Sequence, residues 1–308
     1  MLRNANIYIC TAAEPPSAEA MANAIDRAHW TPLSPGQVEG MGFDGIEQTE
    51  DRSLDLGPWV VGRVRHTQRK VSSQAVRESA EDRIADAEQR NGGIIRNADR
   101  REIMDLVRAE LTRSAPPESV RRWFAYHPQR RMIVMDGTRN QCEATLSLLR
   151  GELGSLGVKP AAYGLLPDTV MTTWLKGESP PANCCGFGES CDMRHPQDTA
   201  NKVRFRAHAL DEDDVRAALD SGMWVTALEL LQDIGSVEPL QFVLTEDGAL
   251  KRIRHPFVEI EDSDREDQLS RLHADLLLGL GNILGVVDLL ARELGGMPEL
   301  QEVREAAA

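Results

Sequence analysis

The sequence predicts an α+β protein with antiparallel sheets, a helical hairpin and a long C-terminal helix. Three observations lead to this fold class. Short segments with alternating apolar residues recur along the chain between turn residues, which is typical of antiparallel strands. Two helical patterns, around residues 73–113, are separated by a break that starts with Asn91-Gly92-Gly93. A long apolar helical pattern closes the chain, and Gly295-Gly296 ends it.

The N-terminal elements are expected to be a strand, a helix and a second strand. Asn6–Cys10 is a short apolar strand, and Pro15–Ala28 is a helix that Ser17 can cap. The segment Thr31–Asp55 is rich in glycine, proline and acids, so we expect mostly loop there. Trp59–His66 has the composition of a strand.

Two helices, expected at Ser73–Arg90 and Arg100–Arg113, make the hairpin. Asp99 and Glu102 have the spacing of a capping box at the start of the second helix. That helix carries an apolar stripe at helical spacing, formed by Ile103, Leu106, Val107 and Leu111. Pro116-Pro117 ends the hairpin and marks a boundary.

The second half of the chain is expected to hold further strands and two helices. We expect a strand at Met132–Asp136 and an amphipathic helix at Asn140–Leu153, whereas Pro181–Ala200 is expected to be irregular. A short helix capped by Asp211 ends at Gly222. Three antiparallel strands follow, with Asp247-Gly248 as a hairpin turn, at Met223–Leu230, Leu240–Thr245 and Ala249–His255.

The C-terminal helix opens with Ser263 and Glu266 at capping-box spacing and runs to about Leu294. One broad apolar face is expected, formed by Leu269, Leu272, Leu276, Leu280, Ile283, Leu284 and Leu290. Three units follow from these elements: a central α/β region of residues 1–70 plus 264–308, a hairpin tip of residues 71–115, and an α+β base region of residues 116–263 that ends in a β-meander.

Composition bounds the class of protein. The formal net charge is −14 and the sequence pI is about 5.0, which by itself argues against nucleic acid as a partner. No stretch reaches the roughly 20 apolar residues of a membrane-spanning helix, and the N-terminus lacks the pattern of a signal peptide, so we expect a cytoplasmic protein without a membrane partner. The five cysteines are an odd, irregular set, which favours free thiols in a reducing compartment.

Basic and acidic residues are separated along the chain. The segments 59–77, 121–131, 202–208 and 251–255 contain basic residues and no acids. If Lys202–Leu210 is a strand, then its side chains alternate between two faces, and Lys202, Arg204, Arg206 and His208 share one of them. Four such groups repel one another and need acidic partners or an anionic ligand. A solvated surface explains any single basic segment, whereas together they suit a DNA backbone.

We find no convincing catalytic pattern, neither a phosphate-binding glycine loop nor a Gly-x-Ser-x-Gly elbow. We therefore expect no enzymatic activity and no cofactor. Four zinc ligands are conceivable at Cys184, Cys185, Cys191 and His195, but adjacent cysteines followed by a five-residue gap are unlike structural zinc sites, and free thiols are favoured. A metal-dependent nuclease that uses acids such as Asp262, Asp264 and Asp267 is an alternative, although capping and solvation explain those acids.

Read in order, several segments of this chain resemble the recombination-associated protein RdgC family. The resemblance rests on these pieces: His29-Trp30-Thr31-Pro32 with Gly40-Met41-Gly42-Phe43; Arg131–Asp136 with Glu143–Leu156; Met171-Thr172-Thr173-Trp174-Leu175; Leu244–Arg252, which contains Asp247-Gly248-Ala249-Leu250-Lys251-Arg252; and Asp264-Arg265-Glu266-Asp267 with Arg271, Ala274 and Asp275.

The resemblance implies a ring-shaped homodimer with double-stranded DNA passing through a hole lined with positive charge. It also implies binding with little sequence preference, restraint of RecA-driven recombination, and a nucleoid-associated location. Thr112–Pro117 departs from the family's Leu-Pro-x-Ala-Phe stretch, whose aromatic helps close the dimer, and Ala207 stands where a basic residue is common. A protein-interaction module that has kept the fold and lost DNA binding is the first alternative.

The charge pattern and the resemblance together indicate eleven candidate DNA-binding residues, of which Arg113 rests on the resemblance alone. They are Arg63, Arg65, Arg69, Lys70, Arg113, Lys202, Arg204, Arg206, His208, Lys251 and Arg252.

Overall fold

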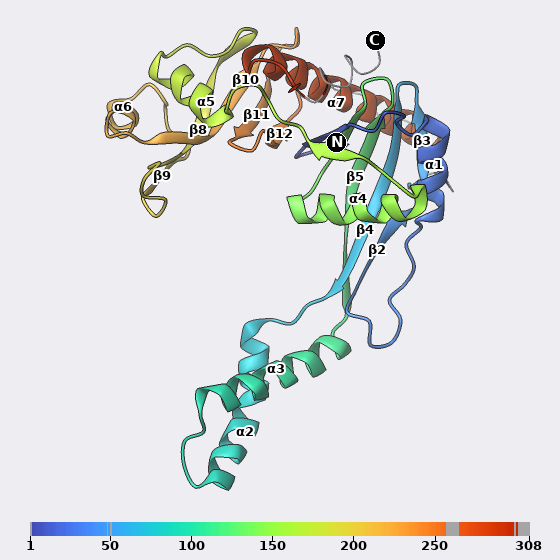
Figure 1. Ribbon diagram of the computed structural model, residues 1–308, viewed down its shortest axis with the longest axis vertical. Coiled ribbons are helices and arrows are strands. Elements are labelled where there is room, and N and C mark those ends of the chain that lie inside the picture. Colours follow the sequence, from blue (N-terminus) through green and yellow to red (C-terminus); the bar gives the residue numbers. More distant parts are fainter. Residues whose placement is uncertain (1, 48, 50, 257–264, 299, 301–308) are drawn as a thin grey trace.

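The computed structural model describes residues 2–47, 49, 51–256, 265–298 and 300, and its fold is α+β as expected. The strands form two antiparallel sheets, one of seven strands and one of five. Figure 1 shows the two sheets next to each other, a long helix, α7 (Arg265–Glu293), lying across them, and a helical hairpin that projects away from the body.

The seven-stranded sheet has the order β2-β4-β5-β6-β1-β7, and β3 pairs with the first residues of β4. The strands are β1 (Asn6–Cys10), β2 (Glu39–Asp44), β3 (Ser53–Leu56), β4 (Trp59–Arg69), β5 (Pro117–His127), β6 (Met132–Met135) and β7 (Val158–Pro160). Strands from both sides of the division expected at residue 116 therefore pair in one sheet.

Most of the described residues in the segment Thr31–Asp55 are loop, as expected, but two strands that the sequence analysis did not anticipate use residues of this segment. β2 lies within Thr31–Asp55, and β3 begins there and ends one residue beyond it, at Leu56. Glycine in β2 has a packing role, because a Cβ at Gly42 would come within 2.5 Å of the Trp30 backbone. A glycine that lets a neighbouring backbone approach closely is compatible with a strand, although a glycine-rich segment looks like a loop in the sequence.

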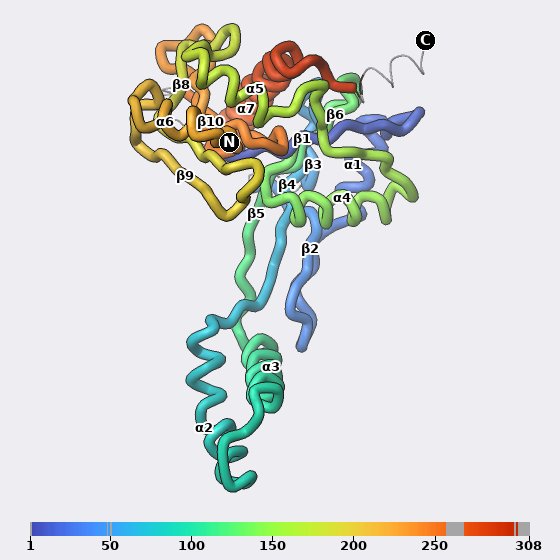
Figure 2. Tube along the Cα trace, turned by 60° about the vertical axis from the view of Figure 1, so that its left-hand side comes forward, coloured from blue at the N-terminus to red at the C-terminus, as the bar shows by residue number. Residues whose placement is uncertain are grey.

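The hairpin is carried by the long strands β4 and β5, which we call the neck. Its helices are α2 (Ser73–Asn91) and α3 (Asn97–Ser114), close to the expected ranges, and Gly92 ends α2 in the left-handed conformation. Figures 1 and 2 both show it standing clear of the body. Its own core is small, formed by Val76, Ala80 and Val107 with partly buried neighbours.

Two details of the second hairpin helix differ from expectation. The N-cap is Arg96, which makes no side-chain capping bond, and Asp99 instead forms an ion pair with Arg96. Leu106 belongs to the expected apolar stripe but is 56% exposed. A two-helix unit buries only the side of each helix that faces the other, so part of a broad stripe stays in solvent.

The five-stranded sheet has the order β12-β11-β10-β8-β9. Its strands are β8 (Cys184–Arg194), β9 (Lys202–Phe205), β10 (Trp224–Gln232), β11 (Leu240–Thr245) and β12 (Leu250–Arg254). The expected irregularity of residues 181–200 was wrong, because β8 occupies much of this segment. Register shifts between β8 and β10 interrupt the alternation of side chains, and this hides the strand in the sequence.

The remaining helices cover the sheets. They are α1 (Ala18–Arg27), α4 (Arg139–Leu153), α5 (Pro167–Lys176) and α6 (Asp213–Asp220). Ser17 caps α1 as expected, whereas α6 begins after Glu212 rather than after Asp211 and has no side-chain cap. α1 and α4 pack in one core against the seven-stranded sheet, and α5 and α7 share a larger core with both sheets.

α7 joins the two sheets. Leu276, Leu280 and Leu290 are fully buried in the larger core, and each contributes about 1.5–3 kcal/mol through burial. By length and composition alone, its stretch Gln268–Glu293 would be able to cross a membrane. Its buried leucines account for this apolar character within the fold. Gly295 and Gly296 follow the helix in the left-handed region, as expected, while the expected cap Ser263 lies outside the described residues.

Candidate nucleic-acid interface

The first group of candidate cations lies on the neck. Arg63, Arg65 and Arg69 alternate along β4 and therefore share one face of it. Their neighbours on β5 are Trp123, which pairs with Arg63, and Arg121, which pairs with Arg65. The same face of β4 begins with residues of the larger core, so the basic stretch continues outward from that core toward the hairpin.

An acid and an aromatic ring hold Arg63. Its Nη1 lies 3.0 Å from Glu47 Oε1, and its guanidinium carbon lies 5.4 Å from the centroid of the Trp123 ring. The arginine side chain is only 21% exposed. A phosphate would have to displace Glu47 before it contacted this arginine.

Arg65 is held more tightly. Its guanidinium carbon lies 3.6 Å from the centroid of the Trp30 ring, and its Nε donates to Ser119 Oγ at 3.0 Å. Asp44 forms ion pairs with both Arg65, at 3.6 Å, and Arg121, at 2.6 Å. Asp44 and Glu47 fall in the segment expected to be loop, so sequence reasoning missed these partners.

Arg69, Lys70 and Arg113 lie at the junction of neck and hairpin. Arg69 donates to two backbone carbonyls, Gln37 O at 3.2 Å and Ala115 O. Neither acceptor is charged, so these bonds do not neutralise the positive charge of the guanidinium. Lys70 is exposed on the connection from β4 to α2, and Arg113 is exposed in the last turn of α3. Within the described part of the chain, Lys70 has no ion pair. This junction therefore offers cations to solvent.

Lys202 and Arg204 lie on β9, at the edge of the five-stranded sheet. Arg204 pairs with Asp192 of β8, and Lys202 pairs with Arg194. Cross-strand partners share a face, so both side chains are on the face of Asp192. Both are exposed, and neither has an ion pair among the residues described. The intervening Val203 points the other way and packs against the larger core.

The expected stripe of four groups is shorter than the sequence indicated. β9 ends at Phe205, and Ala207 has a φ of 49°, so the alternation stops before Arg206 and His208. Arg206 turns back and pairs with Asp192, with 2.5 Å between Nη2 and Oδ1. An acidic partner thus relieves part of the repulsion that we expected a ligand to relieve.

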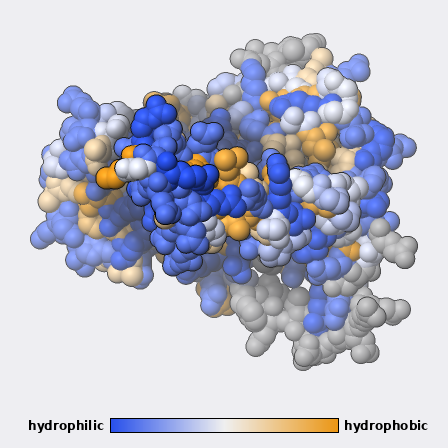
Figure 3. Space-filling model, turned by 90° about the horizontal axis from the view of Figure 1, so that it is seen from below, coloured by the Kyte–Doolittle hydropathy of each residue, from blue (hydrophilic) through white to orange (hydrophobic). Residues whose placement is uncertain are grey.

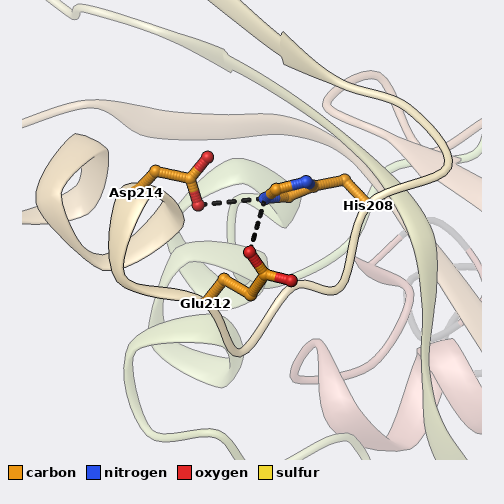
Figure 4. A group of neighbouring side chains, drawn as sticks. All are labelled: His208, Glu212 and Asp214. Carbon is orange, nitrogen blue, oxygen red and sulfur yellow. Dashed lines mark hydrogen bonds and ion pairs between the residues drawn. The ribbon is translucent and has the colours of Figure 1, made fainter.

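His208 meets two carboxylates near the start of α6 instead of extending the stripe. Its Nε2 lies 2.9 Å from Asp214 Oδ1 and 3.8 Å from Glu212 Oε2, as Figure 4 shows. The hydrogen bond to Asp214 raises the pKa of His208 above its ordinary value. The same bond lowers the pKa of Asp214.

Lys251 and Arg252 lie on β12, at the opposite edge of the five-stranded sheet. Both are exposed and line an open groove that also contains Asn4, Asp192 and Arg206. Arg252 has a φ of 52° next to a register shift between β11 and β12, which breaks the alternation of side chains there. No ion pair involves either side chain in the described residues. We call Lys202, Arg204, Lys251 and Arg252 the sheet-face cations.

Acids occupy the middle of the same sheet. Glu246 of the groove accepts Arg194 through both oxygens, at 3.1 and 2.5 Å. Glu229 is buried and accepts from Ser190 at 3.0 Å and from Gln241 at 2.8 Å. The positive charge that remains free is thus confined to the two edge strands, a pattern that the sequence analysis did not anticipate.

The proposed zinc ligands do not come together. None of the five cysteines forms a disulfide, as the sequence analysis expected. Cys184, Cys185 and Cys191 lie along β8, where a strand advances about 3.3 Å per residue, so the first and last are about 23 Å apart along the strand. Of the acids proposed for a nuclease, Asp262 and Asp264 lie outside the described residues, and so does the side chain of Asp267.

The hairpin end of the molecule is polar. Figure 3 views the molecule along the hairpin and shows a mainly hydrophilic surface with small apolar patches. The hairpin pairs much of its own charge, as in Arg83 with Glu110 and Arg100 with Glu88. The arrangement as a whole can attract a polyanion at the sheet edges and at the neck–hairpin junction, through side chains that carry no competing acid.

Known proteins resemble this chain over nearly its whole length. The family model described as "Putative exonuclease, RdgC" matches residues 1–297. The recombination-associated protein RdgC of Pasteurella multocida is 25% identical over 299 residues, covering 96% of this chain and 97% of its own. Its namesake from Actinobacillus succinogenes is 26% identical over 303 residues with the same coverage, and that of Shewanella loihica is 26% identical over 298 residues, covering 91% and 93%. The chain therefore belongs to the RdgC family.

Proposed function

We propose that this protein binds double-stranded DNA without reading its sequence, and that it does so as a homodimer that encircles the duplex. The names of its relatives support a role in recombination. In this proposal the bound protein obstructs RecA-dependent strand exchange and replication on the same DNA, within the cytoplasm and on the nucleoid. No covalent bond is made or broken, so the protein is not an enzyme and needs no cofactor.

The sheet-face cations carry the proposal. They are exposed and lie on the two edge strands of one sheet. Among the described residues, no acid forms an ion pair with any of them. Lysine and arginine on a strand face can reach phosphate oxygens, which every base pair presents alike. Neutralising phosphates releases condensed counterions, and this supplies affinity without sequence preference.

The shape of the chain supports encirclement. In Figure 1 the five-stranded sheet lies at one end of an open curve and the hairpin at the other, with the neck between them. Lys70 and Arg113 add exposed cations at the far end of the neck. A second copy facing the first would close this curve into a ring around a duplex.

A mobility-shift titration at several salt concentrations tests the proposal, with circular and linear duplexes of random sequence. The four sheet-face cations of two protomers make about eight phosphate contacts, so the logarithm of affinity should fall with the logarithm of salt at a slope of about −7. Equal binding to unrelated sequences is expected. Failure to bind at low salt would overturn the proposal, and a strong sequence preference would overturn its non-specific part.

A protein-interaction module is the second candidate, and the acid-paired cations favour it. Arg63, Arg65 and Arg206 are already engaged by carboxylates, and Leu106 and Ile94 expose apolar surface on the hairpin. A flat salt response would favour this function. The family description also names an exonuclease, so the titration includes Mg²⁺, and shortened DNA that Asp264→Ala abolishes would favour a nuclease instead.

A further inference from the structure

A histidine and two carboxylates converge where the chain passes from β9 into α6. One ligand atom each from His208, Glu212 and Asp214 lies within 4.8 Å of the others, and Figure 4 shows the three side chains pointing toward a common point. Among the residues that the structure describes, no other such group of three metal-ligating side chains occurs. Its imidazole nitrogen distinguishes it from the purely acidic patches of the surface.

We propose that His208, Glu212 and Asp214 bind a divalent transition-metal ion such as Zn²⁺. Imidazole and carboxylate are ligands of zinc, at about 2.0–2.2 Å from the metal. Tetrahedral ligands at that distance lie about 3.3–3.6 Å from one another. The His208–Asp214 and His208–Glu212 separations of 2.9 and 3.8 Å bracket this value, so small side-chain rotations bring all three atoms into range.

The histidine is already oriented for this role. Its ring stacks on Phe205 with the centroids 5.3 Å apart and the planes 23° apart, and this contact directs Nε2 toward the carboxylates. The carboxylate of Glu212 is not consumed by capping, because α6 has no side-chain cap. The ordering that metal binding requires is therefore small for the histidine.

The electrostatics also favour a dication. With a neutral imidazole the group carries two negative charges, and Asp211 and Asp213 lie in the same short segment. The 2.9 Å hydrogen bond between His208 Nε2 and Asp214 Oδ1 occupies the place that a metal ion would take. The carboxylates are more than half exposed, so water or an anionic oxygen would complete the coordination.

Calorimetric titration of the full-length protein with Zn²⁺, without DNA, tests the proposal independently of the proposed function. The titrations use a Cys185→Ser background, because that thiol is exposed and would itself bind zinc. One site per chain is expected, with binding at least tenfold weaker in His208→Ala and in Glu212→Gln. Asp213→Asn is the matched control, since Asp213 occupies the same helical turn but lies outside the group.

A pH series separates an imidazole ligand from carboxylates alone. Zinc must displace the proton of His208, so affinity should fall by up to tenfold per pH unit below the pKa of that histidine. Loss of this dependence in His208→Ala is expected. Absence of micromolar binding in the unsubstituted protein, or equal binding in His208→Ala, would overturn the proposal, and circular dichroism checks that each variant is folded.

Discussion

The neck and the five-stranded sheet carry the same kinds of cation in opposite states. On the neck, Arg63 and Arg65 are held by carboxylates and aromatic rings and are mostly covered. On the sheet edges, Lys202 and Arg204 extend into solvent without an acid. Basic residues that look equivalent in a sequence can therefore serve two purposes, which are support of an extended strand pair and attraction of a polyanion.

The paired and the free cations differ because the two regions are stabilised in different ways. The outer part of the neck, residues 65–69 of β4 and 117–122 of β5, lies outside both large cores, so ion pairs and cation–π contacts there replace part of the burial that stabilises the other strands. The edge strands of the five-stranded sheet place Val203 and Ile253 in or against the larger core. Their outward side chains are therefore not needed for stability.

Reversing charge on the sheet edge should give the largest effect on DNA. The double variant Lys202→Glu, Arg204→Glu should lose about 100-fold in affinity and lower the salt slope by about 2 per protomer, because two phosphate contacts become repulsive. Mobility shifts at several salt concentrations measure both quantities. Lys176→Glu, on α5 behind the sheet, is the control and should bind normally. Normal binding by the folded double variant would remove the sheet face from the interface.

The basic strand face that the sequence indicates predicts that reversing the charge of Arg204 and Arg206 together abolishes DNA binding with the fold intact. The structure sharpens this test, because Arg206→Glu would face Asp192 and disturb the sheet. Lys202 therefore replaces Arg206 in the double variant.

Truncating a neck arginine should act on stability instead. Arg65→Ala removes the contact with Trp30 and the bond to Ser119 and leaves Asp44 with one cationic partner, so the free energy of unfolding should fall by about 2 kcal/mol. Urea denaturation measures this change. Arg65→Lys keeps the charge but loses the planar stack and should lose part of that amount. A changed salt slope with unchanged stability would place Arg65 with the DNA-binding residues.

Removing the acid that pairs with Arg206 should turn this arginine into a cation that is free to bind DNA. Asp192→Asn keeps the shape of the side chain but removes the charge that holds Arg206. Affinity for DNA should rise about threefold and the salt slope should become steeper by about 1, because one more phosphate contact becomes available. Parallel titrations of the two proteins measure this. An unchanged slope would mean that Arg206 stays turned toward β8 and away from DNA.

The smallest expected effect is the pH dependence of the His208 contact. The pKa of His208 is raised, so its bond to Asp214 stabilises the fold below the ordinary histidine pKa and is lost as pH rises through the raised value. Asp214, whose pKa is lowered, stays ionised throughout this range. Denaturation of His208→Gln beside the unsubstituted protein should show a stability difference at about pH 5.5 that vanishes near pH 8.5. A difference that grew with pH would contradict the contact.

Much of the fold could be predicted because its signals are local. The strand Leu240–Thr245 has the expected bounds, and Ser17 caps α1, since alternation and capping depend on neighbouring residues. β2 and β8 were missed for the opposite reason. Gly42 is needed for contact with a distant backbone, and register shifts in β8 depend on β10.

The candidate site divides in the same way. The sequence by itself determined which residues are basic, that Lys202 and Arg204 share a strand face, and to which family the chain is similar. Only the tertiary structure decided which cations are free, because their acids come from other elements. Asp44 reaches Arg121 across 77 positions, and Asp192 turns Arg206 away from its strand. A charge acts within a few ångströms of space, and chain folding sets those distances.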